Sequence, residues 1–496
     1  MKKNAVVIGA GIGGLTAACL LASDSRIDNI VVYEQNDAPG GKMQEVQLGD
    51  YRFDTGPSLL TMPFLLQKLF ESCGESMENW LELQEVNPLC RYFYPDGVVF
   101  DNFSDREETL REIHRFAPED AKAYTDFLNH AEKLYDKTAD AFLFNPLYDF
   151  RDLKQLNLFD FLGIDAFSTV AGKVDSFFSS PYLRQFFKRF TTYNGSSPYQ
   201  APATLNVIPH VELNQGGYYV NGGLYSIARA LHNLALKMGV EFRFNTAVKN
   251  IRVEESRVRG IILENGTHVS TDLLIANSDA TDTILNLLPG DVLPQRKRKK
   301  QAALEPSCSG FVMLLGSTRN WDQLKHHNIY FSEDYRREFK DIFEHRKLPE
   351  DPTIYIANTS YSDNNHAPSG GSNLFVLVNA PYEDGQNWQE LQTSYSQKLL
   401  NILENRGLTG LKSSIAEMEI ITPKDFQRRY GSNRGSIYGT SSNNTFSAFL
   451  RPRNKLRKFQ NLYLVGGSTH PGGGIPLVIQ SAFNAFQLFQ RHHEPE

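Results

Sequence analysis

The chain has 496 residues, 41% hydrophobic and 22% charged, values typical of globular proteins rather than of disordered or fibrous ones. Its 57 acidic and 51 basic residues give a formal net charge of -6, so no overall positive field attracts a phosphate backbone and we expect no nucleic-acid partner. A chain of this length exceeds what one hydrophobic core usually organises, which predicts two domains.

The first forty residues predict one βαβ unit. Residues 5–8 read as a buried strand, residues 11–22 as a helix and residues 30–33 as the next parallel strand. The apolar run that ends at Ala22 imitates a signal peptide, but four glycines inside it argue against one, so we expect a cytoplasmic location. No other stretch reaches the roughly 18 continuous apolar residues of a membrane-spanning helix.

A glycine motif lies where this first strand meets its helix. Gly9, Gly11 and Gly14, with Gly13 between them, form G-x-G-x-x-G, and Glu34 follows 20 residues after Gly14 at the end of the second strand. The first glycine permits a tight turn, the second lets the backbone approach a pyrophosphate, and the third permits close packing of helix on strand. Backbone N–H groups at the helix start favour phosphate, while a carboxylate accepts from ribose hydroxyls and repels a 2'-phosphate. The motif predicts FAD or NAD rather than NADP.

After Gly56-Pro57 the spacing of apolar residues becomes typical of long helices. Residues 142–190 are rich in Phe and Tyr, which predicts a helical layer in which most aromatic rings pack in a core and some could line a tunnel. From residue 216 the pattern returns to an amphipathic helix and a strand at 241–244, followed by a hairpin around the turn 264–266.

The remaining segments predict a return to the nucleotide-binding part. Residues 273–276 read as a short apolar strand, and the run of five basic residues at 296–300 as a solvated face and a candidate contact with anionic lipid headgroups. The last fifty residues read as a strand at 462–465, a glycine-rich turn and a helix from Ile475 onward.

These patterns predict an α/β fold with a discontinuous Rossmann-type FAD-binding domain and an inserted mixed α+β, partly helical substrate domain. We assign residues 1–75, 216–289 and 455–496 to the FAD-binding domain. Residues 76–215 and 290–454 are assigned to the substrate and membrane-facing domain.

Cysteine and histidine spacing indicates no metal site. Cys19, Cys73, Cys90 and Cys308 are far apart, so we expect them to be reduced, buried and structural. The adjacent pair at 326–327 is interpreted as a surface pair rather than as metal ligands.

Two further segments favour FAD over NAD. In residues 37–42 the pair Gly40-Gly41 and the basic Lys42 follow an acidic residue, and residues 54–58 read Asp-Thr-Gly-Pro-Ser. Both resemble signatures of the amine-oxidase-like flavoproteins. That resemblance implies that the glycines and a cation cover the FAD pyrophosphate. The C-terminal block 461–476, with Thr469-His470-Pro471, resembles the carotenoid desaturase family of bacterial phytoene and dehydrosqualene desaturases.

The resemblance implies that the second glycine turn flanks the flavin and that His470 is a candidate catalytic residue. The residues expected to bind FAD are Gly9, Gly11, Gly13, Gly14, Glu34, Gly40, Gly41, Lys42, Gly56, Pro57, Val248, Gly466, Gly473, Gly474, Ile475 and Pro476. Residues 432–439 and Gly466-Gly467 look more like the related diapocarotenoid oxygenases, which oxidise a terminal methyl group toward an aldehyde, so desaturation and oxygenation both stay open.

The resemblance implies an enzyme that introduces double bonds into a C30 or C40 polyene by hydride transfer to flavin. A polyene offers no carbonyl, acidic proton or phosphate, so shape and a dry channel must position it. The implied partners are the lipid-soluble polyene, the inner face of the cell membrane as a peripheral surface, and quinone or O2 as electron acceptor. A more remote alternative is a non-catalytic prenyl-lipid binder like the Rab escort and GDP-dissociation inhibitor proteins. An amine oxidase is disfavoured because the usual flavin-linking cysteine is missing near the C-terminus.

Overall fold

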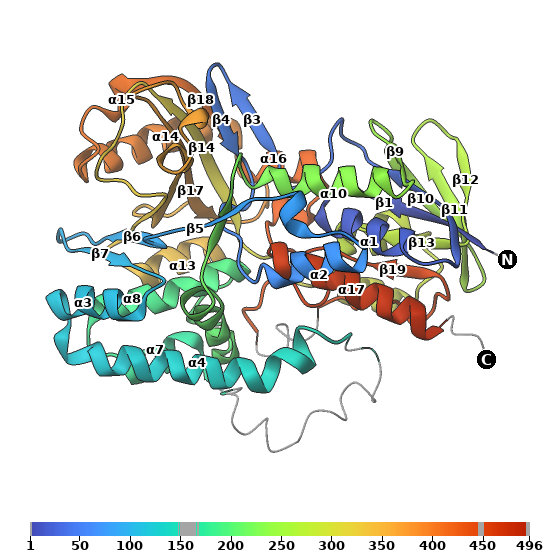
Figure 1. Cartoon of the computed structure of the whole chain (residues 1–496), viewed down its shortest axis with the longest axis horizontal. Coiled ribbons are helices and arrows are strands. Elements are labelled where there is room, and N and C mark those ends of the chain that lie inside the picture. Colours follow the sequence, from blue (N-terminus) through green and yellow to red (C-terminus); the bar gives the residue numbers. More distant parts are fainter. Residues whose placement is uncertain (1, 147, 149–164, 166–167, 445–450, 493–496) are drawn as a thin grey trace.

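A five-stranded parallel sheet forms one half of the molecule in the computed structural model, which describes residues 2–146, 148, 165, 168–444 and 451–492 (Figure 1). Its strand order is β19-β13-β1-β2-β9. The strands are β1 (Lys3–Ile8), β2 (Ile27–Tyr33), β9 (Glu241–Arg243), β13 (Leu273–Ala276) and β19 (Leu462–Leu464). The predicted βαβ unit is therefore confirmed, with β1 in register with β2 and β13 through Val6↔Val31 and Val6↔Leu274.

Both faces of this sheet are covered, which explains why its strands are apolar without alternation. Val7 packs with α1 (Ile12–Ala22), α10 (Tyr225–Lys237) and α17 (Ile475–His492), whereas its neighbour Val6 packs with the opposite layer. That layer is the antiparallel sheet of β10 (Val248–Glu254), β11 (Arg257–Leu263) and β12 (His268–Ser270), which confirms the predicted hairpin. Helix α1 is buried from Ile12 to Leu21, because α10 and α17 both pack against it.

A seven-stranded mixed sheet forms the other half, in the order β18-β14-β17-β16-β15-β6-β7. Its neighbours run antiparallel except β15 and β6. The strands are β6 (Cys90–Phe93), β7 (Val99–Asn102), β14 (Ser309–Ser317), β15 (His327–Tyr330), β16 (Ile354–Asn358), β17 (Ser372–Ala380) and β18 (Ile415–Ile421). Helix α14 (Trp388–Asn405) packs on one face, and the hairpin of β3 (Glu45–Leu48) and β4 (Tyr51–Asp54) packs on the other.

A helical layer lies beside the seven-stranded sheet, at the lower left of Figure 1. It contains α3 (Arg106–Phe116), α4 (Ala121–Phe142), α7 (Val170–Phe177), α8 (Pro181–Lys188) and α13 (Tyr335–Phe343). Phe178, Phe186, Phe187 and Phe190 pack here in one buried cluster with rings of α4 and β7. Core packing is thus confirmed for these described members of the aromatic segment, while most of residues 149–167 lie outside the described residues.

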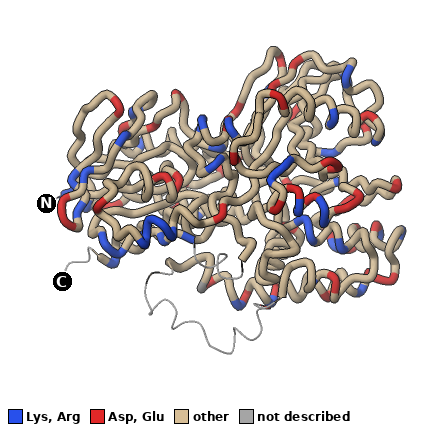
Figure 2. Tube along the Cα trace, turned by 180° about the vertical axis from the view of Figure 1, so that it is seen from behind, with Lys and Arg blue, Asp and Glu red and all other residues tan. Residues whose placement is uncertain are grey.

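The remaining elements are short or connect the two halves. They are α2 (Phe64–Ser72), β5 (Leu83–Glu85), α9 (Val207–Pro209), β8 (Tyr218–Val220), α11 (Ala280–Asp282), α12 (Gln295–Ala302), α15 (Leu411–Ser414) and α16 (Pro423–Tyr430). Helix α12 contains the predicted basic run and buries none of its residues. Elsewhere basic and acidic residues are interspersed along the trace (Figure 2).

The strands of the five-stranded sheet all come from residues 1–75, 216–289 and 455–496, and those of the seven-stranded sheet from the other two segments. The hairpin 45–54 departs from this pattern because it packs on the seven-stranded sheet. We keep the two-domain division as a proposal. No helix among the described residues combines the length and apolarity needed to cross a bilayer.

Two sequence interpretations are wrong. His326 and His327 are both buried rather than on the surface, because His327 begins a central strand and pairs with Ala357 of β16. Loss of hydration lowers the pKa of both rings, that of His326 to about 3. Among the four cysteines, which are free, Cys73 is only half-buried.

Candidate functional site

One cavity of about 640 Å³ lies at the carboxyl ends of the parallel strands and continues between the two halves of the molecule. This edge is where open α/β sheets bind their ligands. Of the residues predicted to bind a cofactor, all except Gly14 line it: Gly9, Gly11, Gly13, Glu34, Gly40, Gly41, Lys42, Gly56, Pro57, Val248, Gly466, Gly473, Gly474, Ile475 and Pro476. His470 also lines it, so residues from the whole length of the chain meet in one space.

Gly14 has the packing role expected of the third glycine. A Cβ on Gly14 would lie 2.0 Å from the carbonyl oxygen of Gly9, so only glycine lets α1 begin this close to the strand. Gly9 itself has φ +90°, a conformation that other residues rarely adopt. Asn277 also packs closely against this turn, because its side-chain oxygen would lie 2.6 Å from a Cβ on Gly13.

Glu34 organises the same turn from the end of β2. Its carboxylate accepts from the backbone N–H of Ala10 at 2.7 Å and from the backbone N–H of Asn36 at 2.9 Å. The side-chain amide of Asn36 adds a third bond at 3.0 Å. Glu34 is 5% exposed, so its charge is held in place by donors rather than by water. An acidic group is therefore fixed at the cavity wall where ribose hydroxyls were predicted to bind.

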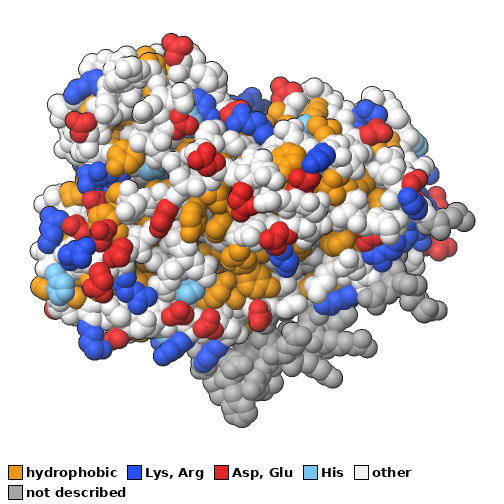
Figure 3. Space-filling model, viewed as in Figure 1, with side chains coloured by type: hydrophobic (Ala, Val, Ile, Leu, Met, Phe, Trp, Pro, Cys, Tyr) orange, Lys and Arg blue, Asp and Glu red, His pale blue; other side chains and the backbone are white. Residues whose placement is uncertain are grey.

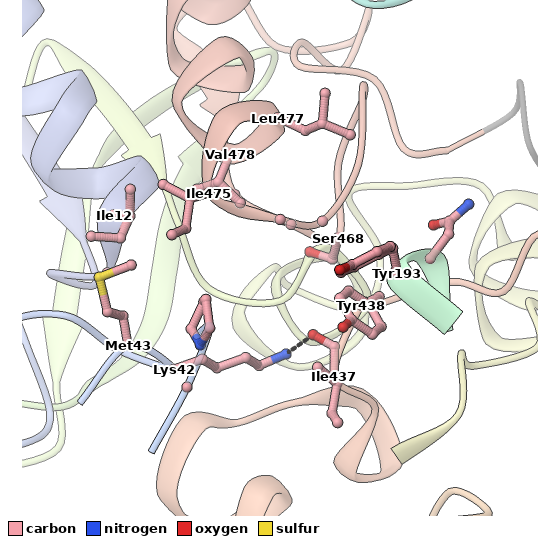
Figure 4. Close-up of a pocket in the computed structure, with 18 of the residues that line it drawn as sticks. Ile12, Lys42, Met43, Tyr193, Ile437, Tyr438, Ser468, Ile475, Leu477 and Val478 are labelled. Atoms are coloured by element: carbon pink, nitrogen blue, oxygen red, sulfur yellow. Dashed lines mark hydrogen bonds between the residues drawn. The ribbon is translucent and has the colours of Figure 1, made fainter. Parts of the chain in front are cut away.

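Two cations, the half-buried Lys42 and the buried Arg451, also line the cavity. Lys42 points across the cavity and its Nζ donates to the carbonyl oxygens of Ser436 and Ile437, both at 2.9 Å (Figure 4). Arg451 donates to the carbonyl oxygens of Tyr438 at 2.9 Å and Gly467 at 3.1 Å. Burial lowers the pKa of Lys42 to about 8 and that of Arg451 to about 10. Neither side chain forms an ion pair within 4.0 Å among the described residues, although the charge of Asp279 partly offsets the effect of burial on the pKa of Lys42.

The second glycine turn closes the cavity from the side of α17. In Figure 4 Ile475 and Val478 of α17 lie near Ile12 of α1, and Tyr438 lies on the far side of the space. A Cβ on Gly473 would lie 2.9 Å from the ring of Tyr438, so this turn is also in close contact with its neighbours.

His470 is fixed by its surroundings. A hydrogen bond of 3.0 Å joins its Nε2 to the carbonyl oxygen of Asn145, and burial lowers its pKa to about 4. The ring is therefore neutral near pH 7, and Nε2 carries the proton that it donates to Asn145. This contact is typical of a structural histidine, and a catalytic role for His470 stays a prediction.

The part of the cavity between the seven-stranded sheet and the helical layer is mostly apolar. Its lining residues there include Leu89, Leu205, Val207, Ile208, Val211, Ile329, Phe375 and Leu377. An ion pair interrupts this lining, because Arg189 Nη2 lies 2.8 Å from Glu212 Oε1 with both side chains buried. Arg189 also donates to the hydroxyl of Tyr92 at 2.6 Å.

Comparison with known proteins identifies the family. Residues 12–487 match the family of flavin containing amine oxidoreductases. The chain belongs to this family. The predictions of an oxidoreductase and of FAD as cofactor are thereby confirmed, as is the recognised superfamily.

Two relatives of this flavin-dependent oxidoreductase are similar over 97% of both chains. A 1-hydroxycarotenoid 3,4-desaturase from a Flavobacterium species is 37% identical over 486 residues, and a 4,4'-diaponeurosporene oxygenase from Staphylococcus aureus is 36% identical over 487 residues. The crystal structure of an oxidoreductase from Methanosarcina mazei superposes with a TM-score of 0.65 at 16% identity, covering 98% of this chain and 100% of that one. The predicted fold class is confirmed.

The residues present fit an FAD of this family. The fit rests on the glycine turn that a Cβ would fill, the buried acid Glu34, and the cations Lys42 and Arg451, neither of which forms an ion pair within 4.0 Å among the described residues. FAD carries a pyrophosphate, and such an anion is what buried cations and helix starts favour.

Sequence reasoning missed several lining residues: Arg189, Asn277, Glu212, His327 and Arg451. Asn277 alone carried a signal, because it directly follows a predicted strand of the sheet that holds the glycine motif. The others lie in segments with no motif, where a charged residue looks the same as one on the surface.

Proposed function

We propose that the chain is an FAD-dependent carotenoid desaturase that introduces double bonds into a C30 or C40 polyene. The observation that carries the proposal is one continuous cavity, glycine-rich at the sheet edge and apolar between the sheet and the helical layer. FAD would supply a two-electron acceptor, so that loss of a hydride from an allylic carbon and of a proton from its neighbour to solvent would give the new double bond, with quinone or O2 as the final electron acceptor.

The chain's own residues bind and orient the polyene and keep water out of the cavity. Leu205, Ile329 and Phe375 present apolar side chains to the part of the cavity between the seven-stranded sheet and the helical layer, where a polyene can be held only by shape and dispersion. The shape of this apolar part fixes which allylic carbon is presented, because the polyene offers few groups that a hydrogen bond could hold.

The side chains on the outer face of the cavity favour entry of the polyene from a lipid surface. Phe64, 43% exposed at the start of α2, contacts Phe144 with ring centroids 6.1 Å apart. The cavity lining residues Met62 and Leu143 are close to these two phenylalanines in the chain. Hydrophobic side chains gather near the centre of this face (Figure 3). We propose peripheral attachment to the inner face of the cell membrane, with the basic helix α12 in contact with anionic headgroups.

The test is expression in hosts that accumulate a colourless C30 or C40 polyene, followed by spectra and masses of the extracted pigment. Desaturation lowers the product mass by two hydrogens per step without adding oxygen. Unchanged pigment in both hosts, from protein that retains flavin, would contradict the proposal.

The second candidate is oxidation of a terminal methyl group. The chain is almost as similar to the diaponeurosporene oxygenase as it is to the desaturase. Residues 432–439 carry the oxygenase-like sequence. The same mass measurement separates the two reactions, because the oxygenase adds oxygen to its product.

A further inference from the structure

The face of the seven-stranded sheet that lines the cavity carries two polar side chains among apolar ones. The strand register pairs Ile329 of β15 with Tyr355 of β16, and Tyr355 with Leu377 of β17. All three residues line the cavity, as does His327, two positions before Ile329 on the same strand. Because alternate residues of a strand share one face, His327 and Tyr355 lie beside the apolar residues that are proposed to hold the polyene.

Hydrogen bonds join these two side chains to a segment that is predicted to bind FAD. The hydroxyl of Tyr355 lies 2.8 Å from Nδ1 of His327 and 2.5 Å from the hydroxyl of Ser58. Ser58 also lines the cavity, and it directly follows Gly56 and Pro57, two of the predicted cofactor-binding residues. The three side chains therefore form one continuous chain of hydrogen bonds that begins in the apolar part of the cavity.

The ring of His327 ends this chain with a free nitrogen. Its Nε2 is buried and has no hydrogen-bond partner among the described residues, while a proton on Nδ1 can be donated to Tyr355. Four other described residues of the lining have an unpaired buried atom: Thr204, Glu212, Tyr335 and Ser432. Three of them are hydroxyls, and a proton on Glu212 would leave the buried charge of Arg189 without its ion-pair partner. Among these five described residues, His327 is therefore the one that offers a neutral base.

A proton that His327 takes up is not stable on the ring. Burial lowers the pKa of His327 well below its usual value, and His326 and Arg189 lower it further. The hydrogen-bond chain removes this difficulty, because Nδ1 can give its proton to Tyr355 while Nε2 takes one up, so the ring stays neutral. Tyr355 then passes its own proton to Ser58, which is half-buried and can release a proton to solvent.

We propose that Nε2 of His327 accepts the proton that the polyene loses and that Tyr355 and Ser58 pass a proton on to solvent, an inference that rests on the proposed function. Loss of a hydride leaves a positive charge spread over the neighbouring double bonds of the polyene, and this charge makes the adjacent C–H bond strongly acidic. A weak neutral base is then sufficient.

The step balances with the two-electron acceptor of the proposed function. One hydride leaves the allylic carbon, the adjacent C–H bond breaks, and its electron pair completes the new double bond. The proton of that bond joins Nε2 of His327, and the proton of Nδ1 leaves through the hydroxyls of Tyr355 and Ser58. Exchange with solvent restores the first tautomer of the ring after the product leaves.

The experiment is a single turnover of an acyclic C30 or C40 polyene by the flavin-loaded protein, followed by polyene absorbance. The same polyene is also prepared with deuterium on one or the other carbon of the bond to be desaturated. In the wild type we expect an isotope effect from the carbon that loses hydride and none from its neighbour, because the hydrogen-bond chain makes proton loss fast.

Tyr355→Phe breaks the chain and keeps the ring packed against His327 and Phe375. We expect product formation to slow by about hundredfold and a second isotope effect to appear on the carbon that loses the proton. The dissociation constant of the polyene and the flavin content should not change. His327→Asn should show the same pattern.

Tyr330→Phe is the matched control. It removes a buried hydroxyl without a described partner from the strand that begins at His327, but Tyr330 does not line the cavity. This variant should keep the rate and the isotope effects of the wild type.

The outcomes separate this inference from the proposed function. An unchanged rate in both Tyr355→Phe and His327→Asn would overturn the proton path and leave the desaturase standing. A slower rate without the second isotope effect would also overturn it, because the two side chains would then only shape the cavity. A wild-type protein that retains flavin but binds and dehydrogenates no polyene would overturn both.

Discussion

Replacing Gly14 by alanine tests the packing of α1 against the first strand. A Cβ there would lie 2.0 Å from the carbonyl oxygen of Gly9 and 3.2 Å from the side-chain nitrogen of Asn277. Cβ contacts under 3.0 Å are essentially never seen. The backbone carbonyl of Gly9 must therefore retreat by about 1 Å, since it cannot rotate away as a flexible side chain would.

Two effects of opposite sign decide the result. Alanine in place of glycine inside a helix stabilises by about 1 kcal/mol. Overpacking a close contact costs about 1–3 kcal/mol, and the upper end applies here because backbone must move. We expect a net loss of about 2 kcal/mol in the free energy of unfolding. Because Gly9 and Gly11 line the cavity, the displaced turn should also weaken flavin binding by about tenfold or more.

Urea unfolding of the flavin-free protein, followed through its first transition, measures the stability, and flavin fluorescence measures the affinity. Gly290→Ala is the control: Gly290 is exposed, and a Cβ there meets no atom within 4 Å, so its effect should stay within about 0.5 kcal/mol. A Gly14→Ala protein that gains stability and retains full flavin affinity would refute the close contact.

Three other changes test the cavity wall. Glu34→Gln places an NH2 group against N–H donors of Ala10 and Asn36, so the FAD dissociation constant should rise by about tenfold or more; unchanged flavin binding would contradict the role of the carboxylate. Lys42 has its folded pKa lowered from 10.5 to about 8, so the folded protein binds fewer protons between these values and the flavin-free wild type should gain up to about 3 kcal/mol as pH rises through that window. Lys42→Met should lack this gain in urea unfolding. His470 has its pKa lowered from 6.5 to about 4, so stability should fall by up to about 3 kcal/mol as pH falls between these values. His470→Asn should show a flatter profile there, and an equal slope in both proteins would contradict burial of the neutral ring.

The sequence predicted the glycine turn between β1 and α1 because the residues that indicate it lie close together in the chain. A buried strand, a glycine turn and a helix follow one another within 22 residues, and each obeys a rule of spacing that the folded chain keeps in β1 and α1. The second glycine turn was predicted by resemblance, and the structure places it in the same cavity. Strand order in the seven-stranded sheet was not predicted, because β6 enters it beside β15 across more than 200 residues of sequence.

The polar residues of the cavity could not be predicted for a different reason. Arg189, Glu212 and His327 carry no spacing that distinguishes them from surface residues, and only the tertiary fold brings them together. The sequence interpretation of His327 was wrong for the same reason: burial depends on the neighbours of β15, which come from distant segments.

The segment that resembles the oxygenases more than the desaturases is the one whose backbone Lys42 and Arg451 bind. Lys42 donates to the carbonyl oxygens of Ser436 and Ile437, and Arg451 donates to that of Tyr438, so three consecutive backbone carbonyls each accept from a cationic side chain. These three residues belong to the segment 432–439, which looked more like the oxygenases than the desaturases. Because its backbone is anchored from both sides, a change of residue there alters the side chains that face the cavity while the backbone stays in place. Ile437 and Tyr438 line the cavity, so at this segment their side chains are the part that a bound molecule can contact.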